Sequence, residues 1–121
     1  MTRFAFICLG GALGTGARYL TTLWATQAFG AKFPFGTLIV NLAGSFLLGF
    51  VMQMFAPSDA RLILTAGVMG GFTTYSSFNH DTTDYFLRGA WLLGAANVAA
   101  TVVGCLAAGV AGIALGRMVS R

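Results

Sequence analysis

Four long apolar stretches, separated by short polar segments, account for most of this 121-residue chain. A helix that crosses a membrane needs roughly 20 apolar residues, so four crossings would fill about two thirds of the sequence. The pattern predicts transmembrane helices over residues 4–26, 36–55, 60–87 and 90–118. Pro34 and Pro57 precede the second and third stretches, as is common where helices begin. We therefore expect a single four-helix transmembrane domain over residues 1–121, with neighbouring helices antiparallel because the connections are short.

The third predicted helix contains a segment that is poor in helix-forming residues. Gly70 and Gly71 are followed, within the next six residues, by two threonines and two serines. Non-helical backbone is tolerated at membrane depth only where protein or a water-filled cavity surrounds it. We expect the helix to break over about residues 70–75, near the middle of the bilayer. The alternative is a continuous helix rich in serine and threonine.

The composition supports a lipid environment. Hydrophobic residues make up 57% of the chain and charged residues 8%, against about 25% charged residues in an ordinary soluble domain. So few charges cannot coat a soluble enzyme, and the single histidine, His80, belongs to no nucleophile-and-base constellation. The seven basic residues are scattered and form no patch for nucleic acid. We expect a membrane protein that is not an enzyme and binds no nucleic acid.

Basic residues divide almost evenly between the two ends of the predicted bundle. One end receives Arg3, Arg61, Arg117 and Arg121. The other receives Lys32 and Arg88, or three basic residues if Arg18 is counted with it. Orientation in a membrane follows the difference in Lys and Arg between its two faces, and here that difference is small. The sequence gives no firm orientation, and insertion in both directions is allowed.

Glycine is unusually common. The chain has 17 glycines, which is about twice the usual share. Gly10 with Gly14, and Gly112 with Gly116, have the four-residue spacing that lets membrane helices approach closely. Four short helices have little interior in which to bury so much small surface. We expect these glycine surfaces to mediate a homo-oligomer.

Polar residues inside the predicted spans form two stripes. Thr37, Asn41 and Ser45 follow one another at four-residue intervals and share one helix face. A weaker stripe runs along the fourth span and consists of Asn97, Thr101 and Cys105. Such residues either hydrogen-bond neighbouring helices as packing contacts or line a pathway, and both interpretations stay open at this point.

The middle of each predicted span lacks a carboxylate, which disfavours a proton-coupled carrier or a cation pathway. Amide and hydroxyl groups can donate hydrogen bonds, and aromatic rings add positively polarised edges. Tyr75 and Phe78 are three residues apart after the expected break, so their rings can share a helix face. Donors and ring edges without carboxylates suit a small anion.

Three segments of the sequence resemble the Fluc (CrcB) family of small fluoride channels. They are residues 10–14 with Arg18 and Tyr19, residues 36–41 with Gly44 and Gly49, and residues 70–78. The order and spacing of the three segments are specific to that family. Together with the length and the four-span layout, the resemblance covers nearly the whole chain.

The resemblance implies a fluoride-selective channel that exports cytosolic fluoride passively and so protects against fluoride toxicity. It also implies an antiparallel, dual-topology homodimer that crosses the bacterial inner membrane several times per chain. A structural sodium ion is implied at the dimer centre. By position, the backbone carbonyls of Gly70 and Thr73 from each subunit would hold this ion.

The same resemblance implies a fluoride pathway. The paired pore phenylalanines of the family correspond to Tyr75 and Phe78, and the pore asparagine corresponds to Asn41. The vestibule arginine corresponds to Arg18, where a positive charge would concentrate anions. The pathway residues implied in this way are Arg18, Asn41, Thr74, Tyr75, Ser77, Phe78 and Thr101.

Four positions depart from the family pattern: Tyr75 stands in place of phenylalanine, Asn79 in place of serine, Asp81 in place of glutamate, and Cys105 in place of serine. These departures leave open a family member that is inactive or has altered selectivity. A small multidrug-type cation transporter is a second alternative, although such proteins use a first-span glutamate that this chain lacks. A third is a non-transporting membrane scaffold subunit, in which the polar residues would serve only packing.

Overall fold

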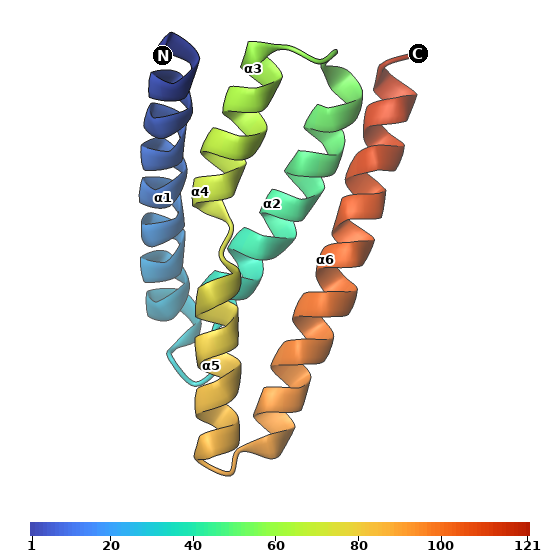
Figure 1. Cartoon of the computed structure of the whole chain (residues 1–121). Coiled ribbons are helices and arrows are strands. Elements are labelled where there is room, and N and C mark those ends of the chain that lie inside the picture. Colours follow the sequence, from blue (N-terminus) through green and yellow to red (C-terminus); the bar gives the residue numbers. More distant parts are fainter.

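The computed structural model describes residues 1–121, and its regular elements are all helices (Figure 1). The first, second and fourth apolar stretches form α1 (Thr2–Phe29), α2 (Phe35–Met54) and α6 (Trp91–Val119). The third stretch is divided among α3 (Asp59–Leu62), the π-helix η1 (Ile63–Met69), α4 (Gly70–Phe72) and α5 (Tyr75–Leu87). Four helical segments therefore run side by side, and the third is composite (Figure 1).

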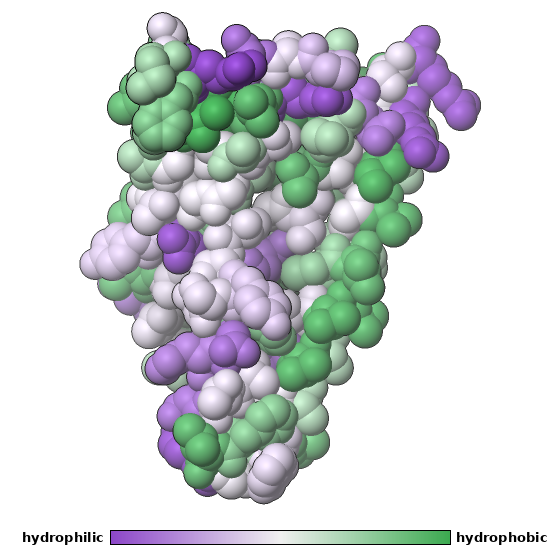
Figure 2. Space-filling model, in the orientation of Figure 1, coloured by the Kyte–Doolittle hydropathy of each residue, from purple (hydrophilic) through white to green (hydrophobic).

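Two helices, α2 and α6, are long and apolar enough to cross a membrane on length and composition alone. The sequence pattern predicted four such spans. The helix α1 is long enough but is not apolar enough to be counted by length and composition. The third stretch is divided into helices that are each too short to be counted. Apolar side chains of α6 such as Leu92, Val103 and Leu106 are exposed, and Figure 2 shows a hydrophobic surface along this helix. Apolar surface of this extent indicates a lipid environment.

The third stretch differs from an ordinary helix in two ways. Thr73 and Thr74 have extended backbone, so α4 and α5 are not one continuous helix. Before this point, Ile63–Met69 winds as a π-helix, which the sequence pattern did not predict. Residue types with ordinary helix propensity do not distinguish a π-helix from an α-helix, because the wider winding depends on local packing. π-helical turns are rare and occur frequently at functional sites.

The glycine pairs lie at close contacts between helices of the same chain. A Cβ atom on Gly14 would overlap the Val68 carbonyl oxygen, and one on Gly10 would lie 3.2 Å from the Ile63 carbonyl oxygen. On the other side of the bundle, a Cβ atom on Gly112 would overlap the carbonyl oxygen of Phe46 in α2. These contacts lie within one chain, so the glycine pairs do not by themselves indicate a homo-oligomer, which stays a prediction. They let α1 approach the third stretch, and α6 approach α2, within one chain.

The charged residues gather at the ends of the bundle. Both termini and α3 lie at one end (Figure 1). Arg3 pairs there with Asp59 at 3.1 Å. At the other end Arg88 pairs with Asp84 at 2.7 Å, one helical turn away on α5. The Tyr85 hydroxyl donates to the Lys32 carbonyl oxygen and ties the α1–α2 connection to α5. The middle of the bundle is left to apolar and uncharged polar side chains, apart from Arg18.

Candidate functional site

A groove of about 530 Å³ lies between α2, the interrupted third stretch and α6. It gathers ten of the residues that the sequence singled out, from three segments of the chain. They are Asn41, Gly44, Ser45, Gly70, Thr73, Thr74, Tyr75, Phe78, Thr101 and Cys105. The lining contains no charged side chain, and it includes Thr65 and Met69, which the sequence reasoning did not select. The expected polar stripes of α2 and α6 thus meet at the interruption of the third stretch.

Asn41 pairs with the backbone of Thr74 at the interruption. The Thr74 amide N–H donates to Asn41 Oδ1 at 2.8 Å, and Asn41 Nδ2 donates to the Thr74 carbonyl oxygen at 3.0 Å. The Asn41 side chain is buried in the face of α2 that packs on this segment. Two reciprocal bonds fix the orientation of the amide, because one of its ends accepts and the other donates.

The glycine that follows on the same face of α2 brings the two segments together. Gly44 lies beside Thr73, and a Cβ atom on Gly44 would overlap the Thr73 Cγ2 methyl group. A larger residue at this position would push the extended segment away from α2. The close approach at Gly44 therefore sets the distance across which Asn41 reaches Thr74.

The interruption leaves two carbonyl oxygens without a donor. In a continuous helix the carbonyl oxygen of Gly70 would accept from the Thr74 amide, four residues on. That amide donates to Asn41 instead, and the carbonyl oxygens of Gly70 and Thr73 accept no hydrogen bond in the chain. Both residues line the groove. The structure thus places both residues with unpaired backbone oxygens in the groove lining.

Arg18 approaches the interruption from the side of α1. Its Nε–H donates to the Gly71 carbonyl oxygen at 3.0 Å, and its side chain is half-buried. Arg18 is not among the residues that line the groove. Arg18, the one basic residue in the middle of a helix, therefore contacts the same segment as Asn41. It does so from α1 and outside the groove, whereas Asn41 contacts the segment from α2.

Tyr75 and Phe78 lie together at the start of α5. Their ring centroids are 5.7 Å apart and the ring planes are inclined by 56°. The side chains differ in burial, since Phe78 is 8% exposed and Tyr75 is 76% exposed. The Tyr75 hydroxyl has no hydrogen-bond partner in the chain and is free to contact solvent or another molecule.

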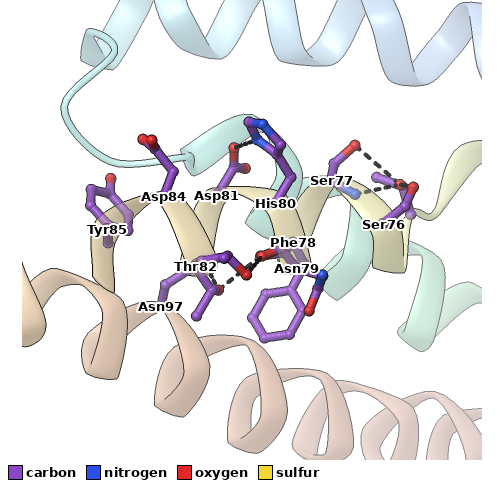
Figure 3. A network of polar contacts seen from close by, with 12 residues as sticks. Ser76, Ser77, Phe78, Asn79, His80, Asp81, Thr82, Asp84, Tyr85 and Asn97 are labelled. Carbon is purple, nitrogen blue, oxygen red and sulfur yellow. Dashed lines mark hydrogen bonds and ion pairs between the residues drawn. The ribbon is translucent and has the colours of Figure 1, made fainter. Parts of the chain in front are cut away.

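Hydroxyl groups form a small cluster at the first turn of α5. Thr74 caps the helix, because its Oγ1 accepts from the Ser77 amide at 3.3 Å. The same oxygen lies 3.2 Å from Ser77 Oγ and 3.3 Å from Ser76 Oγ (Figure 3). Ser77 is half-buried and does not line the groove, whereas Thr74 does.

The stripe on α6 divides into two parts. Asn97 is 2% exposed and donates to Thr82 Oγ1 at 2.9 Å, and Thr82 donates in turn to the Phe78 carbonyl oxygen at 2.8 Å (Figure 3). Asn97 thus acts as a packing contact between α6 and α5, while Thr101 and Cys105 line the groove. The sequence reasoning missed Thr82, although its position four residues after Phe78 places it on the same helix face.

His80 and Asp81 lie away from the groove. The His80 side chain is 83% exposed, and its Nδ1 is 3.7 Å from Asp81 Oδ1 (Figure 3). Neither residue lines the groove described above. The departure from the family pattern at Asp81 therefore concerns a part of α5 outside the groove.

These features define a small, all-helical membrane protein with an uncharged polar groove at an interrupted helix. Residues 5–113 match the family described as CrcB-like protein, Camphor Resistance (CrcB). The chain belongs to this family.

Several relatives match along almost their whole length. The fluoride-specific ion channel FluC of Anaeromyxobacter dehalogenans is 55% identical, with 97% of each chain covered. The protein of the same name from Sorangium cellulosum is 51% identical, with 97% of this chain and 96% of the relative covered. The one from Agrobacterium fabrum is 44% identical, with 97% of this chain and 98% of the relative covered.

Proposed function

We propose that the protein is a fluoride-selective channel that exports cytosolic fluoride passively and so protects the cell from fluoride. The observation that carries the proposal is the groove at Thr73 and Thr74, which offers hydroxyl and amide groups and ring edges but no carboxylate. The names of the relatives that match the full chain point to the same substrate. An inside-negative membrane potential drives an anion outward, so the transport needs no further energy source.

The chemistry of the groove suits a small, strongly hydrated anion. Thr101 presents a hydroxyl donor, and the rings of Tyr75 and Phe78 present positively polarised edges. Thr74 and Ser77 add hydroxyls at the start of α5, and Asn41 keeps one amide hydrogen beyond its bond to Thr74. Arg18 contributes positive potential from outside the groove. A series of neutral hydrogen-bond donors can replace the water molecules around the ion. Such donors bind the ion weakly enough for it to dissociate and pass through the channel.

The functional unit in this proposal is an antiparallel, dual-topology homodimer, with each chain crossing the bacterial inner membrane four times. Tyr75 supports this arrangement, because its ring is 76% exposed beside an open groove that a second copy would cover. The near-equal division of basic residues between the ends of the bundle supports both orientations. A cysteine placed at the C-terminus should react with an impermeant maleimide from both sides of the membrane. Labelling from one side only would contradict dual topology.

The proposal includes a structural sodium ion held by the backbone carbonyls of Gly70 and Thr73 from each subunit. The donor set fits, because both oxygens lack hydrogen-bond donors and both residues line the groove. Carbonyl oxygens are the ligands that hard monovalent cations accept in membrane proteins. When bound, the ion would balance the partial negative charge of these oxygens and hold them in place. The chain itself contributes the extended backbone at Thr73 that points them away from helical partners.

Fluoride efflux from liposomes that contain the purified protein tests the function directly. A potassium gradient with valinomycin sets the potential, and a fluoride electrode records release. We expect rapid fluoride efflux without a proton gradient, and chloride efflux at least about a hundredfold slower, which corresponds to about 2.7 kcal/mol of discrimination. Absence of fluoride efflux, or equal chloride efflux, would overturn the proposal and favour a scaffold role.

A further inference from the structure

The interruption of the third stretch depends on a side chain from a different helix. The amide and the carbonyl group of Thr74 both bond to Asn41, which lies 33 residues earlier in the chain, at 2.8 and 3.0 Å. In a continuous helix the same amide would donate to the Gly70 carbonyl oxygen and the same carbonyl would accept from Phe78. Asn41 thus occupies the amide that would otherwise join α4 to α5, and it also binds the carbonyl group at the start of α5.

We propose that Asn41 is a positioning residue that holds the third stretch open at Thr74 and thereby keeps the Gly70 carbonyl oxygen free to bind a hard monovalent cation. The cation is taken from the proposed function, whereas the Asn41–Thr74 pairing stands independently of it. In the pathway implied by the family resemblance, Asn41 contacts fluoride. In the structure, the side-chain amide of Asn41 is hydrogen-bonded to the backbone N–H and C=O of Thr74.

The surroundings of Asn41 suit this role. The side chain is 8% exposed, so its polar atoms have little access to solvent and depend on partners in the protein. Gly44, one turn further along α2, admits Thr73 so closely that any larger residue would displace it. Thr74 also caps α5 with its own hydroxyl, which accepts from the Ser77 amide at 3.3 Å. The Thr74 backbone is therefore bound to α2 while its side chain begins the next helix.

Asparagine has the reach and the dual chemistry that this contact needs. Its amide accepts through Oδ1 and donates through Nδ2, and so matches one backbone N–H and one backbone C=O at the same time. Alanine offers neither group, and the serine hydroxyl is too short to reach both. Replacement by either residue should release the Thr74 amide to find the Gly70 carbonyl oxygen or to exchange with solvent.

Amide hydrogen exchange of the full-length protein in liposomes measures whether the Thr74 amide is hydrogen-bonded to Asn41. Fragmentation of the labelled protein resolves the exchange of this single amide. In the wild type, this amide should exchange as slowly as amides in the middle of α2. In Asn41→Ala and Asn41→Ser, it should exchange about tenfold faster or more, as expected from the loss of a buried hydrogen bond. Ser45→Ala is the matched control, because Ser45 lines the same groove from the same helix and makes no hydrogen bond to the third stretch. It should leave the exchange of Thr74 unchanged.

A second experiment measures the binding of the cation, independently of fluoride transport. We expect thermal unfolding of the detergent-purified protein to shift upward with sodium but not with N-methylglucamine. The sodium concentration for half of this shift should rise about tenfold in Asn41→Ala and stay within twofold in Ser45→Ala. If Asn41→Ala loses fluoride efflux while its exchange and its sodium dependence match the wild type, Asn41 acts on fluoride directly and the proposal is overturned.

The wild type alone can also refute the proposal, even if neither Asn41 variant folds. Rapid exchange of the Thr74 amide in the wild type would show that the Asn41 pairing is not maintained. A protein that carries no fluoride but protects the Thr74 amide would overturn the proposed function and leave the pairing intact. The two failures are therefore distinguishable.

Discussion

The Nε–H of Arg18 donates a hydrogen bond to the carbonyl oxygen of Gly71, 53 residues later in the chain, at 3.0 Å. In a continuous helix the Gly71 carbonyl would accept from the Tyr75 amide, and the extended backbone of Thr73 and Thr74 prevents this. Asn41 satisfies the Thr74 backbone from the side of α2. Side chains of two different helices thus replace hydrogen bonds that the interruption removes.

Loss of the Arg18 guanidinium should destabilise the protein. A hydrogen bond to a charged group contributes about 1.5–3 kcal/mol, so Arg18→Gln should lower the free energy of unfolding by about this amount. Arg117→Gln is the control, since Arg117 is exposed near the end of α6 and makes no hydrogen bond through its side chain. Denaturant titration of the detergent-purified variants measures both values. Equal stability of the two variants would contradict a role for Arg18 at Gly71.

The two rings at the start of α5 should respond differently to substitution. Tyr75 is largely exposed and its hydroxyl has no partner, so Tyr75→Phe should change the free energy of unfolding by less than about 0.5 kcal/mol. Fluoride efflux should persist in Tyr75→Phe, because the ring edge is retained. Tyr75→Leu removes the ring and should slow efflux about tenfold, which corresponds to an aromatic contribution of up to about 1.5 kcal/mol. Efflux from liposomes compares the two variants, and equal rates would argue against ring-edge contact with the ion.

The glycines of α1 provide a test of close packing within the chain. Gly14→Ala places a methyl group against the Val68 carbonyl oxygen and should destabilise the fold by about 1–3 kcal/mol or more. Gly16→Ala is the matched control, since a Cβ atom there would have no neighbour within 4 Å. It should stabilise the helix by up to about 1 kcal/mol, because alanine favours helix more than glycine does. If unfolding of the two variants is alike while Gly14→Ala changes only dimer assembly, the glycine surface lies between chains after all.

The contact between Asn97 and Thr82 should behave as a packing interaction between α6 and α5. Thr82→Val removes both the acceptor for Asn97 and the donor to the Phe78 carbonyl oxygen. A double-mutant cycle with Asn97→Leu should give a coupling energy of about 0.5–2 kcal/mol, the range of hydrogen bonds between membrane helices. The cycle is measured by unfolding in detergent. Independent effects of the two substitutions would show that the hydrogen bond contributes nothing.

Much of the site could be predicted from the sequence, because helix periodicity places polar residues on faces. The spacing of Thr37, Asn41 and Ser45 predicts one polar face of α2, and Asn41 and Ser45 both line the groove. The double glycine and the hydroxyls after it predict a break over about residues 70–75. Within that range Thr73 and Thr74 are extended, while Gly70–Phe72 stays helical. The sequence reasoning also placed Tyr75 and Phe78 on one face, where their rings lie 5.7 Å apart.

Other features depend on which helices lie next to each other. The polar stripe on α6, which contains Asn97 and Thr101, looks uniform in sequence. In the structure Asn97 donates a hydrogen bond to Thr82, whereas Thr101 lines the groove. The four-residue spacing of Gly10 and Gly14 identifies a surface for close approach but does not name the partner. That partner is the third stretch of the same chain rather than a second copy. A spacing rule describes one helix, and the identity of the neighbour is a property of the bundle.

The sequence by itself determines that this chain belongs in lipid, that it is helical, and that its third apolar stretch contains residues unsuited to a regular helix. These properties follow from composition and local backbone preference, which each residue carries with it. Only the tertiary structure decides how the interruption is satisfied, since Asn41 and Arg18 reach Thr74 and Gly71 across more than 30 residues of sequence. Buried backbone groups must find partners, and where a helix stops supplying them, the neighbouring helices determine which side chains do.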